Sequence, residues 1–97
     1  MNVISKKEIN RFIKKHRDTK AYLEAWYHAV NAKATTWKTS SDIKKRYPSA
    51  SFLEKNYVIF NIKGNKYRLV TKIAYNTGRV FIKWIGTHAE YDKKRFP

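Results

Sequence analysis

The sequence is organised around residues 57–92, where three runs rich in β-branched and aromatic residues are separated by two turn signals. The runs are Tyr57–Ile62, Lys66–Tyr75 and Arg79–Thr87, and the turns are Lys63-Gly64-Asn65 and Asn76-Thr77-Gly78. Glycine and asparagine adopt positive φ at little steric cost, so each turn can reverse the chain within a few residues. The stretch therefore predicts three strands that pair as an antiparallel meander.

Alternation along these strands predicts which side chains share a face, because successive side chains of a pleated strand point to opposite sides. In the second strand one face carries Tyr67, Leu69, Thr71, Ile73 and Tyr75, and the other carries Arg68, Val70, Lys72 and Ala74. The same alternation in the third strand sets Val80, Ile82, Trp84 and Gly86 against Phe81, Lys83, Ile85 and Thr87. Where the strand register allows it, Arg68, Lys72 and Lys83 would form a cationic floor for a polyanion.

Two helices are predicted ahead of the meander, where they would cover one side of the sheet. Ser5 and Glu8 fit a capping box, and an apolar stripe at helical spacing follows them. Asp18 is a suitable cap for a second helix over about residues 19–32. Residues 33–51 predict a loop that contains a short helix over residues 42–47, with Trp37 as a packing anchor.

Length and residue usage set the class of protein. The 97 residues predict a single domain over residues 1–97. The chain has no cysteine, and His16, His28 and His88 show no metal-ligand spacing, so we expect neither a metal nor a cofactor. We find no signal peptide and no apolar run long enough to span a bilayer, which predicts a cytoplasmic protein without a membrane partner.

The charge is strongly unbalanced. Lysine and arginine number 22 against 7 aspartate and glutamate residues, which gives a formal net charge of +15. Such a density of cations attracts polyanions by releasing their condensed counterions. Nucleic acid is therefore the leading partner, and an acidic protein is the alternative.

The end of the meander carries the residues best suited to chemistry. A helical turn opened by Thr87 or His88 would bring His88, Tyr91 and Asp92 to one side through i, i+3 and i+4 spacing. A histidine, a tyrosine and a carboxylate in one place can move protons. They can equally form a hydrogen-bonded plug at the edge of the sheet, and spacing alone favours this structural role.

Two segments of the chain resemble a known family. Residues 60–70 (FNIKGNKYRLV) and residues 80–92 (VFIKWIGTHAEYD) are similar to the HigB toxins of the RelE superfamily, found in type II toxin–antitoxin systems. The shared pattern is a strand ending in Gly-Asn, a hydrophobic strand carrying an arginine, and a strand ending in Thr-His-x-Glu-Tyr-Asp. It covers about the last forty residues, and the first fifty match only in character.

The resemblance implies an α+β fold in which two N-terminal helices pack on a small twisted antiparallel sheet. It also implies a metal-independent endoribonuclease, an mRNA interferase that cleaves message on the ribosome and is neutralised by a cognate antitoxin of the helix-turn-helix type. Carried over by motif position, the catalytic candidates are Arg68, Lys83, His88, Tyr91 and Asp92. Asn65, Lys72 and Lys93 are candidate substrate contacts, although turn geometry explains Asn65 equally well.

Two other functions stay open at this point. The chain could be a non-catalytic RNA- or ribosome-binding module in which Arg68 and Lys83 hold phosphate and His88 is structural. It could also be a protein-interaction subunit whose basic surface docks an acidic partner. Growth arrest that Arg68→Ala or His88→Ala relieves at equal protein level would favour the enzyme.

Overall fold

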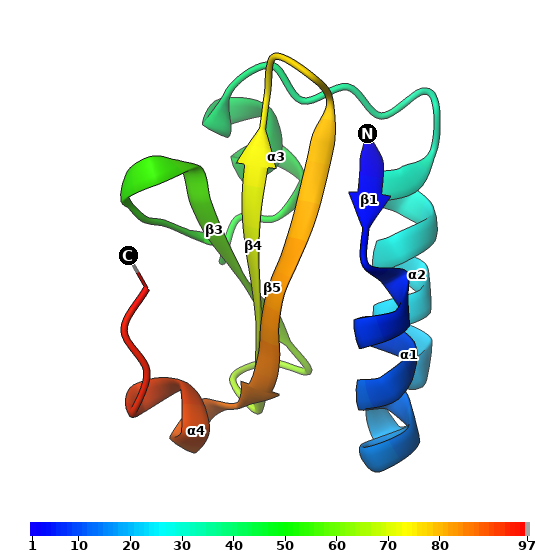
Figure 1. The fold of residues 1–97 in the computed structure, drawn as a ribbon, viewed down its shortest axis with the longest axis vertical. Coiled ribbons are helices and arrows are strands. Elements are labelled where there is room, and N and C mark those ends of the chain that lie inside the picture. The colour runs from blue at the N-terminus through cyan, green and yellow to red at the C-terminus, as the bar shows by residue number, and fades with distance from the viewer. Residues whose placement is uncertain (97) are drawn as a thin grey trace.

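The computed structural model describes residues 1–96, and within them helices pack on a five-stranded mixed sheet of order β1-β5-β4-β3-β2 (Figure 1). This arrangement confirms the predicted α+β class. The strands are β1 (Asn2–Ile4), β2 (Ser51–Phe52), β3 (Tyr57–Ile62), β4 (Tyr67–Ala74) and β5 (Arg79–Thr87). The helices are α1 (Lys6–Lys15), α2 (Lys20–Asn31), α3 (Ser40–Arg46) and α4 (His88–Asp92), with short 3₁₀ turns at Arg17–Thr19 and Glu54–Asn56.

Strands β3, β4 and β5 form the predicted antiparallel meander, and their bounds lie within one residue of the predicted runs. The turn between β3 and β4 has positive φ at Lys63 (51°) and Gly64 (66°), and the turn between β4 and β5 has positive φ at Gly78 (69°). Left-handed geometry therefore falls on Lys63 and Gly64, and Asn65 does not adopt it. The explanation of Asn65 as a left-handed turn residue is wrong for this reason.

Strand β1 is an element that the sequence patterns did not indicate. It pairs in parallel with β5, with Asn2 opposite Arg79 and Ile4 opposite Phe81. Three residues are too few to show a period, and a parallel partner needs no turn signal nearby. The sheet is therefore mixed at this edge and antiparallel elsewhere.

Helices α1 and α2 lie side by side against one face of the sheet, as Figure 1 shows. The main core between these layers takes its apolar side chains from the predicted helix stripes and from one face of the meander. Trp37, the predicted anchor of the loop before α3, is only 5% exposed and its ring stacks near Phe60 with centroids 6.2 Å apart. Other members of this core include Ile9, Phe12, Ile13, Leu23, Trp26, Val30, Val58, Ile62, Leu69, Ile73 and Val80.

Two predicted helix caps are wrong. Within residues 1–96, the side chain of Ser5 makes no cap hydrogen bond, and Glu8 pairs instead with Arg11 at 3.1 Å. Helix α2 begins after Thr19, not after Asp18, because the carboxylate of Asp18 turns toward the sheet. Capping boxes occur instead at Thr39 with Asp42, before α3, and at Thr87 with Glu90, before α4.

Candidate nucleic-acid interface and catalytic centre

The register of β4 decides which of its side chains point away from the helices. Leu69, Thr71 and Ile73 are buried on the helix side. Arg68 pairs with Asn61 of β3 and Gly86 of β5, and Lys72 pairs with Tyr57 and Phe81. Arg68 and Lys72 therefore share the face opposite α1 and α2, which we call the open face.

A β-bulge in β5 changes what the open face contains. Val70 pairs with Trp84 and Thr71 pairs with Ile82, so Lys83 is an extra residue on β5. A single extra residue moves every later side chain to the other face. The alternation predicted for Trp84 and Gly86 is therefore wrong, and both lie on the open face beside Val70 and Arg68.

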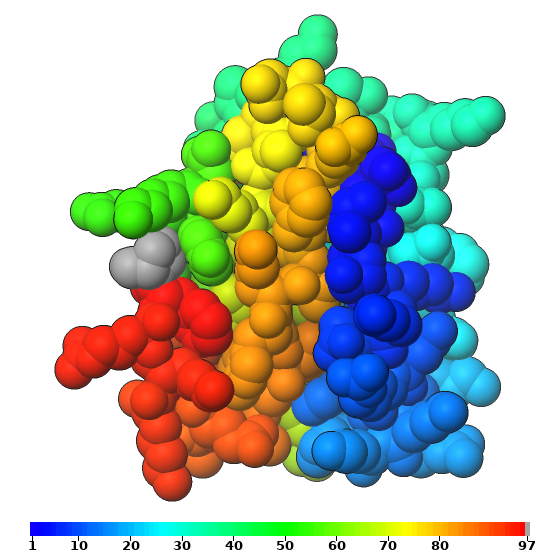
Figure 2. All heavy atoms as spheres, in the orientation of Figure 1, coloured from blue at the N-terminus to red at the C-terminus, as the bar shows by residue number. Residues whose placement is uncertain are grey.

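An aromatic cluster crosses the open face. The ring of Phe96 lies 6.4 Å from Tyr57 on β3, 5.9 Å from Trp84 on β5 and 6.0 Å from Tyr91 on α4. Val70, which pairs with Trp84 and points away from the main core, is fully buried on this face. Figure 2 shows the C-terminal segment in red against β5 in orange, with α1 in blue on the other side of β5.

Gly86 makes room for this cluster. A Cβ atom at Gly86 would lie 2.3 Å from two ring carbons of Trp84 and 3.0 Å from Oε1 of Glu90. Any side chain there would displace the indole. The glycine of the Ile-Gly-Thr-His segment is therefore a packing requirement at the end of β5.

Cations lie over these rings. The guanidinium of Arg68 is 6.0 Å from the ring centroid of Tyr91, the ammonium of Lys72 is 5.8 Å from Tyr57 and that of Lys94 is 5.8 Å from Trp84. Bases of single-stranded RNA stack on aromatic faces while cations hold their phosphates. The open face offers both kinds of contact over β3, β4 and β5.

Helix α4 places His88 and Asp92 in contact. Nδ1 of His88 lies 3.1 Å from Oδ2 of Asp92, as the i, i+4 spacing predicted, and the two side chains are 46% and 60% exposed. The helix begins at a capping box in which the hydroxyl of Thr87 accepts from the backbone N–H of Glu90 and Oε1 of Glu90 accepts from the backbone N–H of Thr87. The bond from Thr87 lowers the pKa of Glu90.

The turn between β3 and β4 joins Arg68 to His88. Nη1 of Arg68 donates to the carbonyl oxygen of Asn65 at 3.2 Å, and the backbone N–H of His88 donates to the carbonyl oxygen of Lys66 at 3.0 Å. Arg68 is half-buried and His88 is accessible. Arg68, His88, Tyr91 and Asp92 therefore form one accessible group, which we call the Arg68–His88 centre.

The remaining candidates lie around this centre. Asn65 is exposed and contributes its carbonyl to Arg68, and Lys93 is exposed just after α4. Lys72 lies further along β4, beside Tyr57. Lys83 lies over the ring of Phe81 at 5.7 Å, and within residues 1–96 no contact joins it to Arg68 or His88.

A groove lies on the other side of β5, between this strand and α1. Its volume is about 430 Å³, and Lys83 lines it together with Arg11 and Lys15 of α1. The cationic surface thus continues from the open face across β5 to α1.

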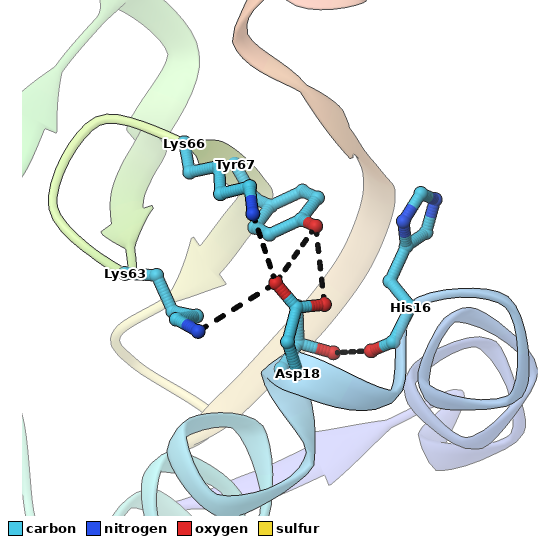
Figure 3. A network of polar contacts seen from close by, with 6 residues as sticks. His16, Asp18, Lys63, Lys66 and Tyr67 are labelled. Atoms are coloured by element: carbon cyan, nitrogen blue, oxygen red, sulfur yellow. Dashed lines mark hydrogen bonds and ion pairs between the residues drawn. The ribbon is translucent and has the colours of Figure 1, made fainter.

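A second polar network, absent from the sequence predictions, joins the 3₁₀ turn at Arg17–Thr19 to the turn between β3 and β4 (Figure 3). The carboxylate of Asp18 accepts from the hydroxyl of Tyr67 at 3.1 Å and from the ammonium of Lys66 at 3.3 Å, and the ammonium of Lys63 is 3.6 Å away. Burial alone would raise the pKa of Asp18, but these bonds and charges outweigh it and lower that pKa. Asp18 lies 48 and 49 residues before Lys66 and Tyr67 in the sequence, so residue spacing could not predict their contact.

The described part of the chain has neither a metal-binding cluster nor a helix suited to crossing a membrane. Residues 1–96 contain no group of three or more His, Cys, Asp or Glu side chains arranged to hold a metal ion. Over the same residues, none of the helices is both long and apolar enough to cross a membrane.

Comparisons with known proteins identify the family of the chain. Residues 19–94 match the HigB toxin family, described as the RelE-like toxic component of a toxin–antitoxin system. The chain is 28% identical to the mRNA interferase HigB of Escherichia coli O6:H1 over 95 residues, which is 96% of this chain and 90% of that protein. It is 30% identical to the mRNA interferase toxin HigB of E. coli K12 and to the mRNA interferase HigB of Shigella flexneri, over 95% of this chain and 88% of each relative. The chain therefore belongs to the HigB family of RelE-like toxins.

Proposed function

We propose that this toxin is an endoribonuclease, an mRNA interferase that cleaves message on the ribosome at the Arg68–His88 centre. The observation that carries the proposal is the turn between β3 and β4, whose carbonyls hold Arg68 and the start of α4 together at the edge of a basic, aromatic face. The relatives named as mRNA interferases support the same activity.

RNA cleavage without a metal ion requires three functions from the protein. Cleavage by the neighbouring 2′-hydroxyl requires that this oxygen lose its proton, that the crowded phosphorane be stabilised and that the leaving 5′-oxygen be protonated. The guanidinium of Arg68 suits the second function because its fork binds two phosphate oxygens and stays charged at any working pH. It is the group to which we assign the developing negative charge.

His88 is the proposed proton-transfer group. Imidazole titrates near neutrality, so it can act as general acid or base at physiological pH. Its Nδ1 faces Asp92 at 3.1 Å, which leaves Nε2 for the substrate. Asp92 would then fix the ring orientation and the tautomer.

The other candidates bind and orient RNA in this proposal. Tyr91 stacks on a base or orients the phosphate, since aromatic faces bind unstacked RNA bases. Its ring lies beside the guanidinium of Arg68, which binds the phosphate in this proposal. Lys72, Lys93 and the turn residue Asn65 extend the contact along the strand. Lys83, which lies away from the Arg68–His88 centre, supplies positive charge on the side of α1.

The basic helices have a role in this proposal if the substrate is ribosome-bound message. Lys6, Lys7, Lys14 and Lys15 are exposed on α1. Contacts from lysine to RNA phosphate supply affinity without reading sequence. We therefore assign α1 to ribosomal RNA and the open face to the message.

Charge reversal on α1 tests this division. Replacing Lys6, Lys7, Lys14 and Lys15 together by Glu should weaken association with ribosomes in pelleting assays by more than tenfold, because the favourable phosphate contacts become repulsive. Replacing the same four residues by Arg is the matched control and should leave association unchanged. Equal pelleting of the Glu and Arg variants would remove α1 from the interface.

The partners follow from the family. A toxic component of a toxin–antitoxin system acts with an antitoxin. We propose a cognate antitoxin of the helix-turn-helix type, encoded beside the toxin, and action in the cytoplasm, where message is translated. Co-expression with the neighbouring reading frame should relieve growth arrest and yield a co-purifying complex.

The experiment that tests the function is primer extension on a defined message. We expect new 5′ ends when toxin, message and ribosomes are combined, and far fewer when ribosomes are left out. Cleavage that is equal in both reactions would show that free RNA is the substrate. Absence of cleavage in both, with growth arrest retained, would favour a non-catalytic RNA-binding module.

A further inference from the structure

Asp18 belongs to no part of the mechanism above, yet it is tied to the turn that holds the Arg68–His88 centre together. It lies in the 3₁₀ turn between α1 and α2, and its carboxylate bonds to Lys66 and Tyr67 at the start of β4 (Figure 3). In a chain with 22 basic and 7 acidic residues, a carboxylate bound by two lysines and a tyrosine restrains a segment that would otherwise repel itself.

Lys66 connects Asp18 to His88. Its ammonium donates to Asp18 at 3.3 Å, while its backbone carbonyl accepts the N–H of His88 at 3.0 Å. The residue before it, Asn65, presents the carbonyl that accepts from Arg68. A shift of Lys66 therefore moves acceptors for both members of the centre.

Tyr67 provides a second connection. Its hydroxyl donates to Asp18 at 3.1 Å, and its ring packs edge-on against Phe12 and His16, with centroids 5.6 and 5.2 Å away. The backbone of Tyr67 pairs with Thr87, the residue whose capping box opens α4. Its position therefore affects where α4 begins, and His88 is the first residue of that helix.

We propose that Asp18 is a positioning residue for the Arg68–His88 centre, acting through the turn between β3 and β4. The proposal rests on the proposed nuclease function for its kinetic consequence, although the geometric consequence is independent of it. Asp18 acts through Lys66 and Tyr67 and has no contact with the reacting atoms. A misplacement of catalytic groups by about 1 Å can lower a rate by about a hundredfold.

The first test measures geometry without any substrate. Asp18→Asn keeps the size of the side chain and removes the charge that holds Lys66 and Lys63. Glu24→Gln is the matched control, because it makes the same change in net charge at an exposed residue of α2. We expect the NMR signals of the His88 ring and the Arg68 guanidinium to shift in Asp18→Asn and to stay in place in Glu24→Gln.

The second test separates rate from binding. With ribosome-bound message, Asp18→Asn should lower kcat by about ten- to a hundredfold and change KM by less than about threefold, because the phosphate-binding surface is intact. Glu24→Gln should match the wild type in both constants. A purely structural role would instead lower the fraction of folded protein, which far-UV circular dichroism measures.

A second variant keeps the proposal testable if Asp18→Asn folds poorly. The side chain of Lys66 is 62% exposed, so Lys66→Gln removes the same ion pair with little risk to the core. Because both changes break the ion pair between Asp18 and Lys66, the kcat of the double variant should be no lower than that of Asp18→Asn alone. Losses that multiply would overturn the proposal.

Other outcomes are equally decisive. Unchanged His88 and Arg68 signals in Asp18→Asn would overturn the proposal, as would a fall in kcat that Glu24→Gln reproduces. If the wild-type protein cleaves no RNA, the nuclease function fails, and the NMR comparison still decides whether Asp18 positions the two side chains.

Discussion

Arg68→Ala should lower the cleavage rate of ribosome-bound message by about 10²- to 10³-fold, the range measured when one preorganised donor to a transition-state oxyanion is removed. Arg68 lies in the open face beside Gly86, with its guanidinium over Tyr91 and one nitrogen bound to the carbonyl of Asn65. This arrangement orients the fork before substrate arrives. Single-turnover primer extension at saturating ribosomes gives the rate.

Two variants separate charge from geometry. Arg68→Lys keeps the positive charge and loses the bidentate fork, so we expect it to recover only part of the rate. Arg79→Ala removes a guanidinium at the other end of the open face, where Arg79 pairs with Ala74, and should leave the rate within about twofold. Full activity in Arg68→Ala, with wild-type thermal stability, would mean that Arg68 takes no part in cleavage.

Phe60→Ala should have the largest effect on stability. Phe60 is 1% exposed, and its ring lies 5.3 Å from Trp26, 5.2 Å from Tyr47 and 6.2 Å from Trp37. Truncating such a residue leaves a cavity among rigid rings that cannot close, at a cost of about 3–5 kcal/mol. The free energy of unfolding of a native protein is about 5–15 kcal/mol, so this loss removes a large part of the stability and should leave the variant close to unfolding.

The measurement is urea unfolding followed by circular dichroism. Phe52→Ala is the matched control, because Phe52 is the same residue type on β2 and is 37% exposed. It should cost less than about 1 kcal/mol, as surface substitutions do. Equal midpoints for the two variants would contradict the core assigned to the aromatic residues around Phe60.

The parts of the fold that the sequence predicted are those specified locally. The turns at Gly64 and Gly78 fixed the bounds of β3, β4 and β5, and the apolar stripes fixed α1 and α2. Local spacing also placed His88 against Asp92, because helix geometry alone brings residues four apart together.

The parts that it did not predict depend on partners far along the chain. The bulge at Lys83 leaves the residue pattern looking regular, so Trp84 and Gly86 were assigned to the wrong face. Asp18 stands where a helix cap is expected, but its carboxylate accepts hydrogen bonds from Tyr67 and Lys66 instead. For the bulge, the missing information was the register of β4 against β5. For Asp18, a tertiary contact outweighed the local preference for capping a helix.

The parallel pairing of β1 with β5 affects how the protein emerges during synthesis. Residues 2–4 have no strand partner until residues 79–81 have been translated and have left the exit tunnel. Contacts between such distant segments form late and slow the folding reaction. The nascent toxin therefore completes its five-stranded sheet only after β5, the last of its strands along the chain, has left the ribosome.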